Sequence, residues 1–303
     1  MNTIPIEQNS ERQLQRLAAQ RQLYATAKLV FGWQLIISAP LAVLLAFSVV
    51  IYPPLKSFAA LWGILITLCD IAWLTPWQEH LRDAAARTQE LFDCDVLGLP
   101  WDELKAGKRP DPELVKEQAD KYKTWEASMP PLTDWYAKDV GCLPLYIARL
   151  VCQRANCWWD VKQRRRYAIT VIFSVVVIFV VVLILAMGNG FTIEDFVMKV
   201  AAPLSPALLL GYRQFSEQMD ASTQLDKLKE HSEKLWTDAL DGKPEPEISA
   251  RARRLQDEIL EHRRRSPLVF DALFRHLRRD FEIQMNHGAT EFIAEAKQKL
   301  GLF

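Results

Sequence analysis

The sequence predicts an all-α protein: a four-span helical membrane protein with two hairpins of spans and a helical cytoplasmic module. Three observations predict this class. Residues 168–187 form an apolar run without a charged side chain, and as a helix this run would rise about 30 Å, the thickness of the hydrocarbon core of a bilayer. Further apolar segments lie at about 29–52, 58–77 and 194–212. The remaining sequence is polar, with helical spacing of its apolar residues and no strand alternation.

The N-terminal part predicts a cytoplasmic helix followed by the first hairpin. Residues 1–28 are polar and helix-prone, and the apolar segment that follows them lies too far along the chain for an ordinary cleaved signal. Residues 29–77 form transmembrane hairpin 1, in which Pro40 kinks the first span and "PPLKS" makes the turn. Aromatic residues flank the second span, as suits the membrane interface.

Residues 78–167 predict a cytoplasmic helical insertion. Its first helix extends the second span until "VLGLP" ends it. Another helix begins with Asp111 as N-cap and Pro112 as first residue. A third, from "LPLYIARL" onward, continues without a break into the third span, so a movement of the soluble part would pull on the membrane part.

Residues 168–212 predict transmembrane hairpin 2, and residues 213–303 a cytoplasmic helical tail. The spans of this hairpin run at 168–188 and 194–212, across the turn "GNGFTIED". The first tail helix continues the fourth span and ends at "DGKPEPE", and two helices follow. Their apolar stripes predict a packed core. The stripes consist of Ile248, Leu255 and Ile259, and of Leu268, Leu273, Phe274, Leu277 and Phe281.

The distribution of cations predicts the orientation. Lys and Arg gather before the first and third spans and after the fourth, whereas the hairpin turns contain only Lys56. Both termini are therefore expected in the cytoplasm. Trp158, Trp159 and Arg164 to Arg166, at the entry to the third span, are interpreted as interfacial anchors and headgroup-binding cations.

Composition and motifs predict neither catalysis nor a cofactor. The 37 Lys and Arg balance the 37 Asp and Glu, which argues against DNA or RNA binding. Phosphate loops, metalloprotease pairs, nucleophile elbows and kinase signatures are absent from the sequence. The five cysteines indicate neither a disulfide framework nor a zinc site. Asp93 and Asp95 in "FDCD" could hold a metal, although a helix ending at a polar loop is the simpler interpretation.

Four residues in the predicted spans are candidates for pore or gating roles. Asp70 lies about two turns from the cytoplasmic end of the second span, where it either meets a polar lumen or sits at the interface. Lys199 lies near the outer end of the fourth span and could snorkel to the headgroups. Pro203 and Pro206 bend that span, which suits either a movable element or a passive kink.

Three segments are distinctive: "QRQLYATAK" before the first span, "LFDCDVLGLPWDEL" after the second, and "DWYAKDVGCLPLYIARLVCQRANCWWDVKQRRRYA" before the third. Together with the four spans they resemble the four-transmembrane effector family found beside bacterial SMODS-type nucleotidyltransferases in cyclic-oligonucleotide anti-phage defence. The resemblance covers nearly the whole chain. It implies a suicide effector of the bacterial inner membrane, linked to a nucleotidyltransferase, that senses a cyclic oligonucleotide and permeabilises the membrane. It implies no catalytic residues.

A cyclic oligonucleotide needs aromatic faces for its bases and Arg or Lys donors for its phosphates. The candidate ligand-binding residues are Trp101, Arg109, Tyr136, Arg149 and Arg154, with packing and surface pairing as the alternative roles. If Arg149 and Arg154 do not bind, the tail cations Arg251, Arg254 and Arg263 to Arg265 are the next place to look.

Two other functions compete with the effector hypothesis. A membrane-anchored sensor or scaffold would use its spans as anchors and its cytoplasmic helices to bind a protein partner. A small transporter is disfavoured because the spans carry few polar groups. Four spans are too few to enclose a hydrated pore, so the effector hypothesis also predicts a homo-oligomer in the lipid bilayer.

Overall fold

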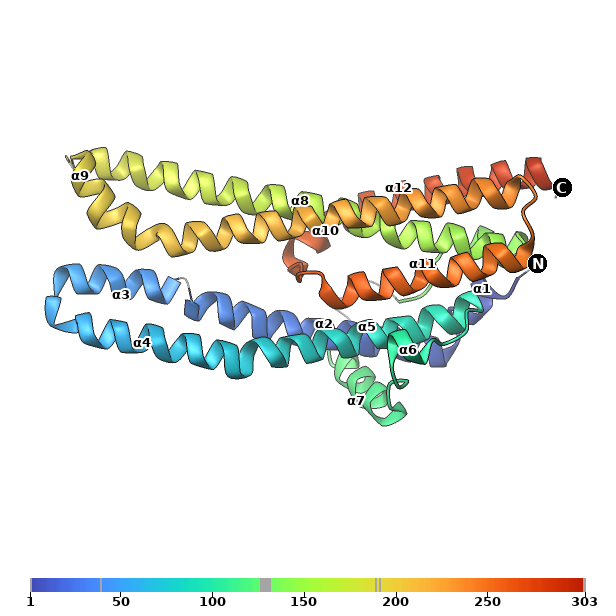
Figure 1. Cartoon of the computed structure of the whole chain (residues 1–303), viewed down its shortest axis with the longest axis horizontal. Helices are drawn as coiled ribbons and strands as arrows, with labels where there is room; N and C mark the ends of the chain where they lie inside the picture. Colours follow the sequence, from blue (N-terminus) through green and yellow to red (C-terminus); the bar gives the residue numbers. More distant parts are fainter. Residues whose placement is uncertain (1, 39, 126–131, 189, 191, 302–303) are drawn as a thin grey trace.

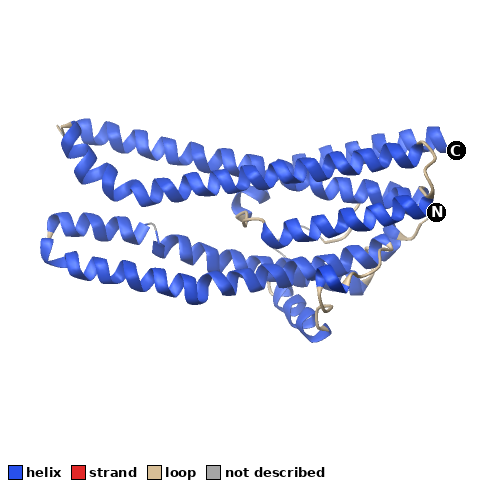
Figure 2. Ribbon diagram, in the orientation of Figure 1, coloured by secondary structure: helices blue, strands red, loops and turns tan. Residues whose placement is uncertain are grey.

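The computed structural model describes residues 2–38, 40–125, 132–188, 190 and 192–301, and within these ranges the protein is helical without a strand (Figure 2). This confirms the predicted all-α class. The α-helices are α1 (Ile4–Glu7), α2 (Glu11–Ser38), α3 (Pro40–Ile51), α4 (Lys56–Cys69), α5 (Thr75–Leu97), α6 (Glu103–Ala106), α7 (Pro112–Lys123), α8 (Leu145–Gly188), α9 (Ile193–Phe196), α10 (Ala202–Leu240), α11 (Glu245–Arg265) and α12 (Asp271–Leu300).

The molecule is elongated, with the hairpin turns at one end and both chain termini at the other (Figure 1). One hairpin is formed by α3 and α4, and the other by the second half of α8, α9 and the first half of α10. The opposite half holds α1, α6, α7, α11 and α12 together with the polar parts of α2, α5, α8 and α10. We call this half, residues 2–28, 78–167 and 213–301 as far as they are described, the polar module.

Long helices join the two halves. Helix α8 runs through 44 residues and α10 through 39, each from the polar module into an apolar segment. Helix α2, Glu11–Ser38, likewise runs from the polar module into the first predicted span. In the second predicted span, a π-helical turn at Asp70–Leu74 connects α4 directly to α5. Each of the four apolar segments is therefore continuous, or nearly so, with a helix of the polar module.

The apolar half exposes large hydrophobic side chains that a soluble protein would bury. Ile169, Phe173 and Ile184 on α8 are 56%, 67% and 64% exposed. Among the described residues, two helical runs are long and apolar enough to cross a membrane, Pro53–Leu97 and Leu145–Gly188, and their most apolar stretches are almost entirely unburied. Their exposed surfaces fit lipid rather than a protein core. The count of four spans stays a prediction.

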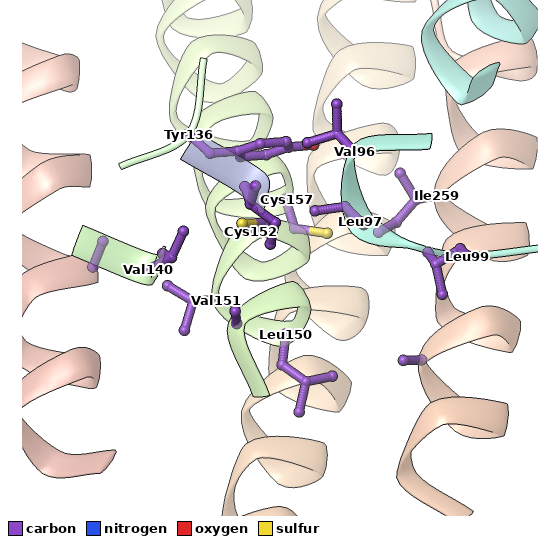
Figure 3. Packing of buried hydrophobic residues seen from close by; sticks show 14 of the residues in the cluster. Val96, Leu97, Leu99, Tyr136, Val140, Leu150, Val151, Cys152, Cys157 and Ile259 are labelled. Atoms are coloured by element: carbon purple, nitrogen blue, oxygen red, sulfur yellow. The ribbon is translucent and has the colours of Figure 1, made fainter. Parts of the chain in front are cut away.

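The polar module has a core of its own. In it α5, the segment after α7, α8 and α11 meet (Figure 3). Leu97, Ile147, Leu150 and Leu255 are at most 2% exposed. The predicted core residues Ile248, Leu255 and Ile259 are all buried there, because they repeat with the helical period along α11.

Some local expectations differ from the structure. The "FDCD" residues lie inside α5, which ends only at Leu97, where Gly98 adopts a left-handed conformation. Helix α12 begins at Asp271, so buried Leu268 precedes it. The connection is extended at Ser266, as is usual for a residue before a proline, and again at Phe270, directly before the helix. The side chains of Leu273, Phe274 and Leu277 lie outside the described residues.

Candidate functional site in the polar module

A cavity of about 450 Å³ lies where α2, α8, α11 and α12 come together. Its volume falls in the range of about 300 to 1,000 Å³ that is typical of small-molecule sites. The described lining residues are mainly polar, charged or aromatic. They come from α2, α5, the segment before Tyr136, α8, α10, α11, the α11–α12 connection and α12. The shape of the cavity therefore depends on the relative positions of these elements.

Aromatic rings and cations share the cavity wall. The rings belong to Tyr24, Trp125, Trp135 and Trp159, and the cations to Arg21, Lys28, Arg164 and Arg263. Three carboxylates, of Asp134, Asp160 and Glu282, also line it. The guanidinium of Arg21 lies over the ring of Trp135, 5.8 Å from its centroid. Flat rings beside guanidinium groups can bind a ligand that has both aromatic faces and anionic groups.

Arg164 joins three elements at one side of the cavity. Its Nη1 donates to Oε1 of Gln218 on α10 and to the carbonyl oxygen of Pro267, both at 2.8 Å. Its Nε donates to Asp160 at 3.1 Å. Gln218 in turn donates to the carbonyl oxygen of Leu268 at 2.9 Å. Arg164, only 7% exposed, therefore ties α8 and α10 to the α11–α12 connection.

One polar atom beside the cavity is unsatisfied. Gln20, 6% exposed, lines the cavity and donates to Gln89 at 3.1 Å. Its Oε1 has no hydrogen-bond partner among the described residues. An unmet buried acceptor costs about 1 to 3 kcal/mol.

The imidazole of His262 is neutral near pH 7. Burial lowers its pKa to about 4, although Asp160 acts in the opposite direction. Its Nε2 lies 2.7 Å from the hydroxyl of Ser266. The positive charge in the cavity near neutral pH therefore comes from arginine and lysine.

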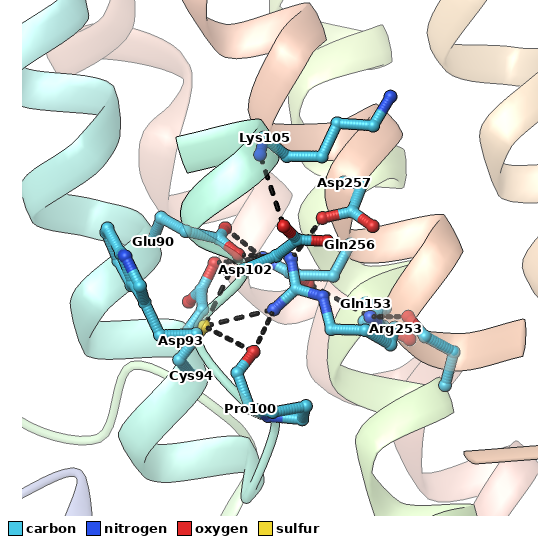
Figure 4. Close-up of polar contacts among 12 residues, drawn as sticks. Glu90, Asp93, Cys94, Pro100, Asp102, Lys105, Gln153, Arg253, Gln256 and Asp257 are labelled. Atoms are coloured by element: carbon cyan, nitrogen blue, oxygen red, sulfur yellow. Dashed lines mark hydrogen bonds and ion pairs between the residues drawn. The ribbon is translucent and has the colours of Figure 1, made fainter. Parts of the chain in front are cut away.

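A buried polar network lies between α5 and α11 and includes Glu90, Asp93 and Gln256 (Figure 4). It extends to Arg263, one of the cavity cations. Asp93 is 0% exposed and accepts from Arg263 at 2.6 Å. Gln256 donates to Asp93 at 3.0 Å and to Glu90 at 2.8 Å. Burial alone would lower the pKa of Arg263, but Asp93, Tyr136 and Glu90 together outweigh it, so the pKa lies above its usual value. Among the described residues, no group of three or more His, Cys, Asp or Glu could hold a metal.

The structure does not bring the five predicted ligand-binding residues together, and none of them lines the cavity. Tyr136 is 2% exposed and its hydroxyl donates to Asp93 at 2.6 Å. Arg149 is 6% exposed and donates to the carbonyl oxygen of Gly98. These contacts form part of the core, and a ligand role for the two residues stays a prediction.

The other three predicted residues lie in two further places. The guanidinium of Arg109 lies 5.8 Å from the ring centroid of Trp101, so these two residues do meet. Arg154 pairs with Glu233 at 2.8 Å and stacks on Phe292 beside a small cavity of about 70 Å³. Ligand binding by these residues also stays a prediction.

The pore candidates lie at irregular places in the apolar half. Asp70 opens the π-helical turn of its span and accepts hydrogen bonds from Gln34 and Thr75. Lys199 lies in a second π-helical turn, Val197–Ala201. Such turns occur frequently at functional sites. Pro206 lies inside α10. The side chains of Lys199 and Pro203 lie outside the described residues, and the pore roles stay predictions.

Sequence reasoning missed most of the cavity residues. The sequence assigns Trp159 and Arg164 to the membrane interface, whereas the structure places both in the cavity wall. Arg263 is among the second group of candidate cations, after Arg149 and Arg154. Residues 157–166 are rich in tryptophan and arginine, which could have indicated a ligand site. The same residue types also mark the cytoplasmic membrane interface, so the sequence does not distinguish the two roles.

The comparisons with known proteins agree with this architecture. Residues 2–292 match the family described as the SMODS-associating 4TM effector domain. A probable CBASS effector molecule of Bacillus cereus (strain VD146) is 26% identical over 232 residues, which cover 73% of this chain and 76% of that relative. No solved structure matches. The family match spans almost the whole chain, and the protein therefore belongs to the SMODS-associating 4TM effector domain family.

Proposed function

We propose that this protein is a suicide effector of the bacterial inner membrane, activated by a cyclic oligonucleotide and permeabilising the membrane as a homo-oligomer. Family membership supports an effector role in anti-phage defence beside a SMODS nucleotidyltransferase. The family description names an effector and no catalytic activity.

The continuity of helices between the two halves carries the proposal. Because α8 and α10 are single helices, a change in the polar module moves the apolar segments directly. The apolar half contains few polar groups. A water-filled path through the membrane therefore requires several copies of the chain, with their polar residues facing one another. Asp70, hydrogen-bonded to Gln34, and Lys199 are the candidates to face such a path.

Dye release from liposomes tests the proposal. The purified full-length protein is reconstituted with a self-quenched dye, and the protein-free products of the linked nucleotidyltransferase, made from the four ribonucleoside triphosphates, are added. We expect rapid release, and none with products of a catalytically inactive nucleotidyltransferase. Binding without release would contradict permeabilisation and favour the sensor or scaffold function.

A further inference from the structure

From the cavity geometry we infer that the messenger, a small cyclic oligonucleotide, binds inside the 450 Å³ cavity and acts on the membrane segments through Arg164. This inference rests on the proposed function and gives it a site. It assigns ligand binding to residues of the cavity wall instead of the five candidates predicted from the sequence, which lie apart in the structure.

The cavity offers what each part of such a ligand requires. Bases can stack on Trp135 and Trp159, and a stacked base contributes about 1 to 3 kcal/mol. Phosphodiester oxygens can accept from guanidinium groups, of which Arg164 retains Nη2 without a partner among the described residues. A simple anion would leave the rings unused, and an apolar ligand would leave the cations unused.

The position of the cavity explains how binding could reach the membrane. Lys28 precedes the first predicted span directly, and Arg164 precedes the third by four residues, so the ligand would lie at the membrane entry. On the same side Phe270 stacks on Phe31 of the first span, with ring centroids 5.4 Å apart. The α11–α12 connection therefore packs on one span while its carbonyl oxygens hold α8 and α10.

Ligand binding competes for the group that makes this connection. A phosphate that binds Arg164 bidentately, across Nη1 and Nη2, displaces a bond from Nη1 to Pro267 or Gln218, because both Nη1 hydrogens are already used. Loss of either bond loosens α8 from the α11–α12 connection or from α10, while Gln218 still holds α10 to Leu268. The ligand then favours the state in which the two hairpins can rearrange, which is the differential binding that a switch requires.

The sequence of α8 supplies matched controls for this inference. Trp158 and Trp159 both pack edge-on against Phe281, with centroids 6.4 and 5.9 Å away, but only Trp159 lines the cavity. Arg164 and Arg165 both bond to α10, the second through Ser222 and Asp226, but only Arg164 lines the cavity. Each pair has similar chemistry at neighbouring positions.

Calorimetry on the full-length protein in detergent tests the site. The probes are 3′,3′-cyclic dinucleotides and cyclic trinucleotides of all four bases, together with the nucleotidyltransferase products. We expect Trp159→Leu to weaken binding by about 5- to 150-fold, the range that corresponds to loss of one stacked base. Arg164→Gln should weaken it by at least tenfold. Trp158→Leu and Arg165→Gln should stay within about twofold of the parent protein.

The outcomes separate the inference from the proposed function. If the parent protein binds a probe and both cavity variants bind it equally well, the cavity assignment is wrong while the proposed function stands. If the parent protein binds none of the probes, activation by a cyclic oligonucleotide fails as well. Should Arg164→Gln or Trp159→Leu not fold, Arg164→Met and Trp159→Met replace them, because methionine keeps apolar bulk without a cation or an aromatic face, and unchanged affinity in both would equally overturn the inference.

Discussion

At the residue scale, Asp93 and Arg263 form a buried ion pair beside the cavity, and the stability of each charge depends on the other. Asp93 is 0% exposed and the side chain of Arg263 is 10% exposed, with 2.6 Å between Oδ2 and Nη1. Removing one charge leaves the other buried and unpaired, which costs about 3 to 5 kcal/mol. The pair also positions a cavity cation, so it links stability to the site.

We predict that Asp93→Asn lowers the melting temperature of the detergent-solubilised protein by about 10 °C, since 1 kcal/mol corresponds to a few degrees in a protein of this size. Tryptophan fluorescence during heating measures it. The control is Asp120→Asn, which breaks a pair at 2.7 Å with Lys116 where both side chains are about half exposed. Exposed pairs contribute about 0 to 1 kcal/mol. Equal shifts in the two variants would contradict the role assigned to the buried pair.

At the element scale, α8 is the helix that joins the cavity to an apolar segment. Ile169 lies five residues after Arg164 and is 56% exposed, so it makes little contact with the rest of the chain. A proline there removes a backbone hydrogen bond and clashes with a carbonyl of the preceding turn, which costs about 3 kcal/mol and kinks the helix.

We predict that Ile169→Pro keeps nucleotide affinity within about twofold and reduces messenger-triggered dye release at least tenfold, because the kink separates the cavity from the span. Ile169→Ala is the control and should retain both properties. Calorimetry and the liposome assay measure the two effects on the same preparation. Full release by the proline variant would show that α8 does not carry the signal.

At the scale of the whole molecule, the two hairpin turns lie together at one end and the chain termini at the other (Figure 1). This arrangement suits a protein that enters and leaves the membrane on one side. Cations near the predicted span ends point to the cytoplasm as that side.

We predict that an alkaline-phosphatase fusion after Gly190 is active and that one after Gly301 is inactive, because the enzyme requires export to be active. Alkaline-phosphatase activity is measured in colonies that express each fusion, and immunoblots check that the two fusions are equally abundant. The reverse pattern would invert the topology, and two active fusions would mean an even number of spans between the second hairpin turn and the C-terminus, which would contradict the single span predicted there.

The class of the protein and most of its helices could be predicted from the amino-acid sequence. An uncharged run of twenty residues allows few structures other than a span, and Gly98 and Asp111 mark helix ends through backbone preferences that act locally. The family resemblance could also be seen in the sequence, because segments such as "QRANCWWD" are contiguous in the chain.

The position of the cavity, in contrast, depends on how distant helices pack together. Gln20, Trp159 and Arg263 are far apart in the sequence and meet because α2, α8 and α11 pack around one core. Whether a tryptophan or arginine near a span faces lipid headgroups or the interior depends on the rotation of its helix against its neighbours. Trp158 and Trp159 differ by one residue, about 100° around α8, and only the packing of the other helices places the second ring in the cavity.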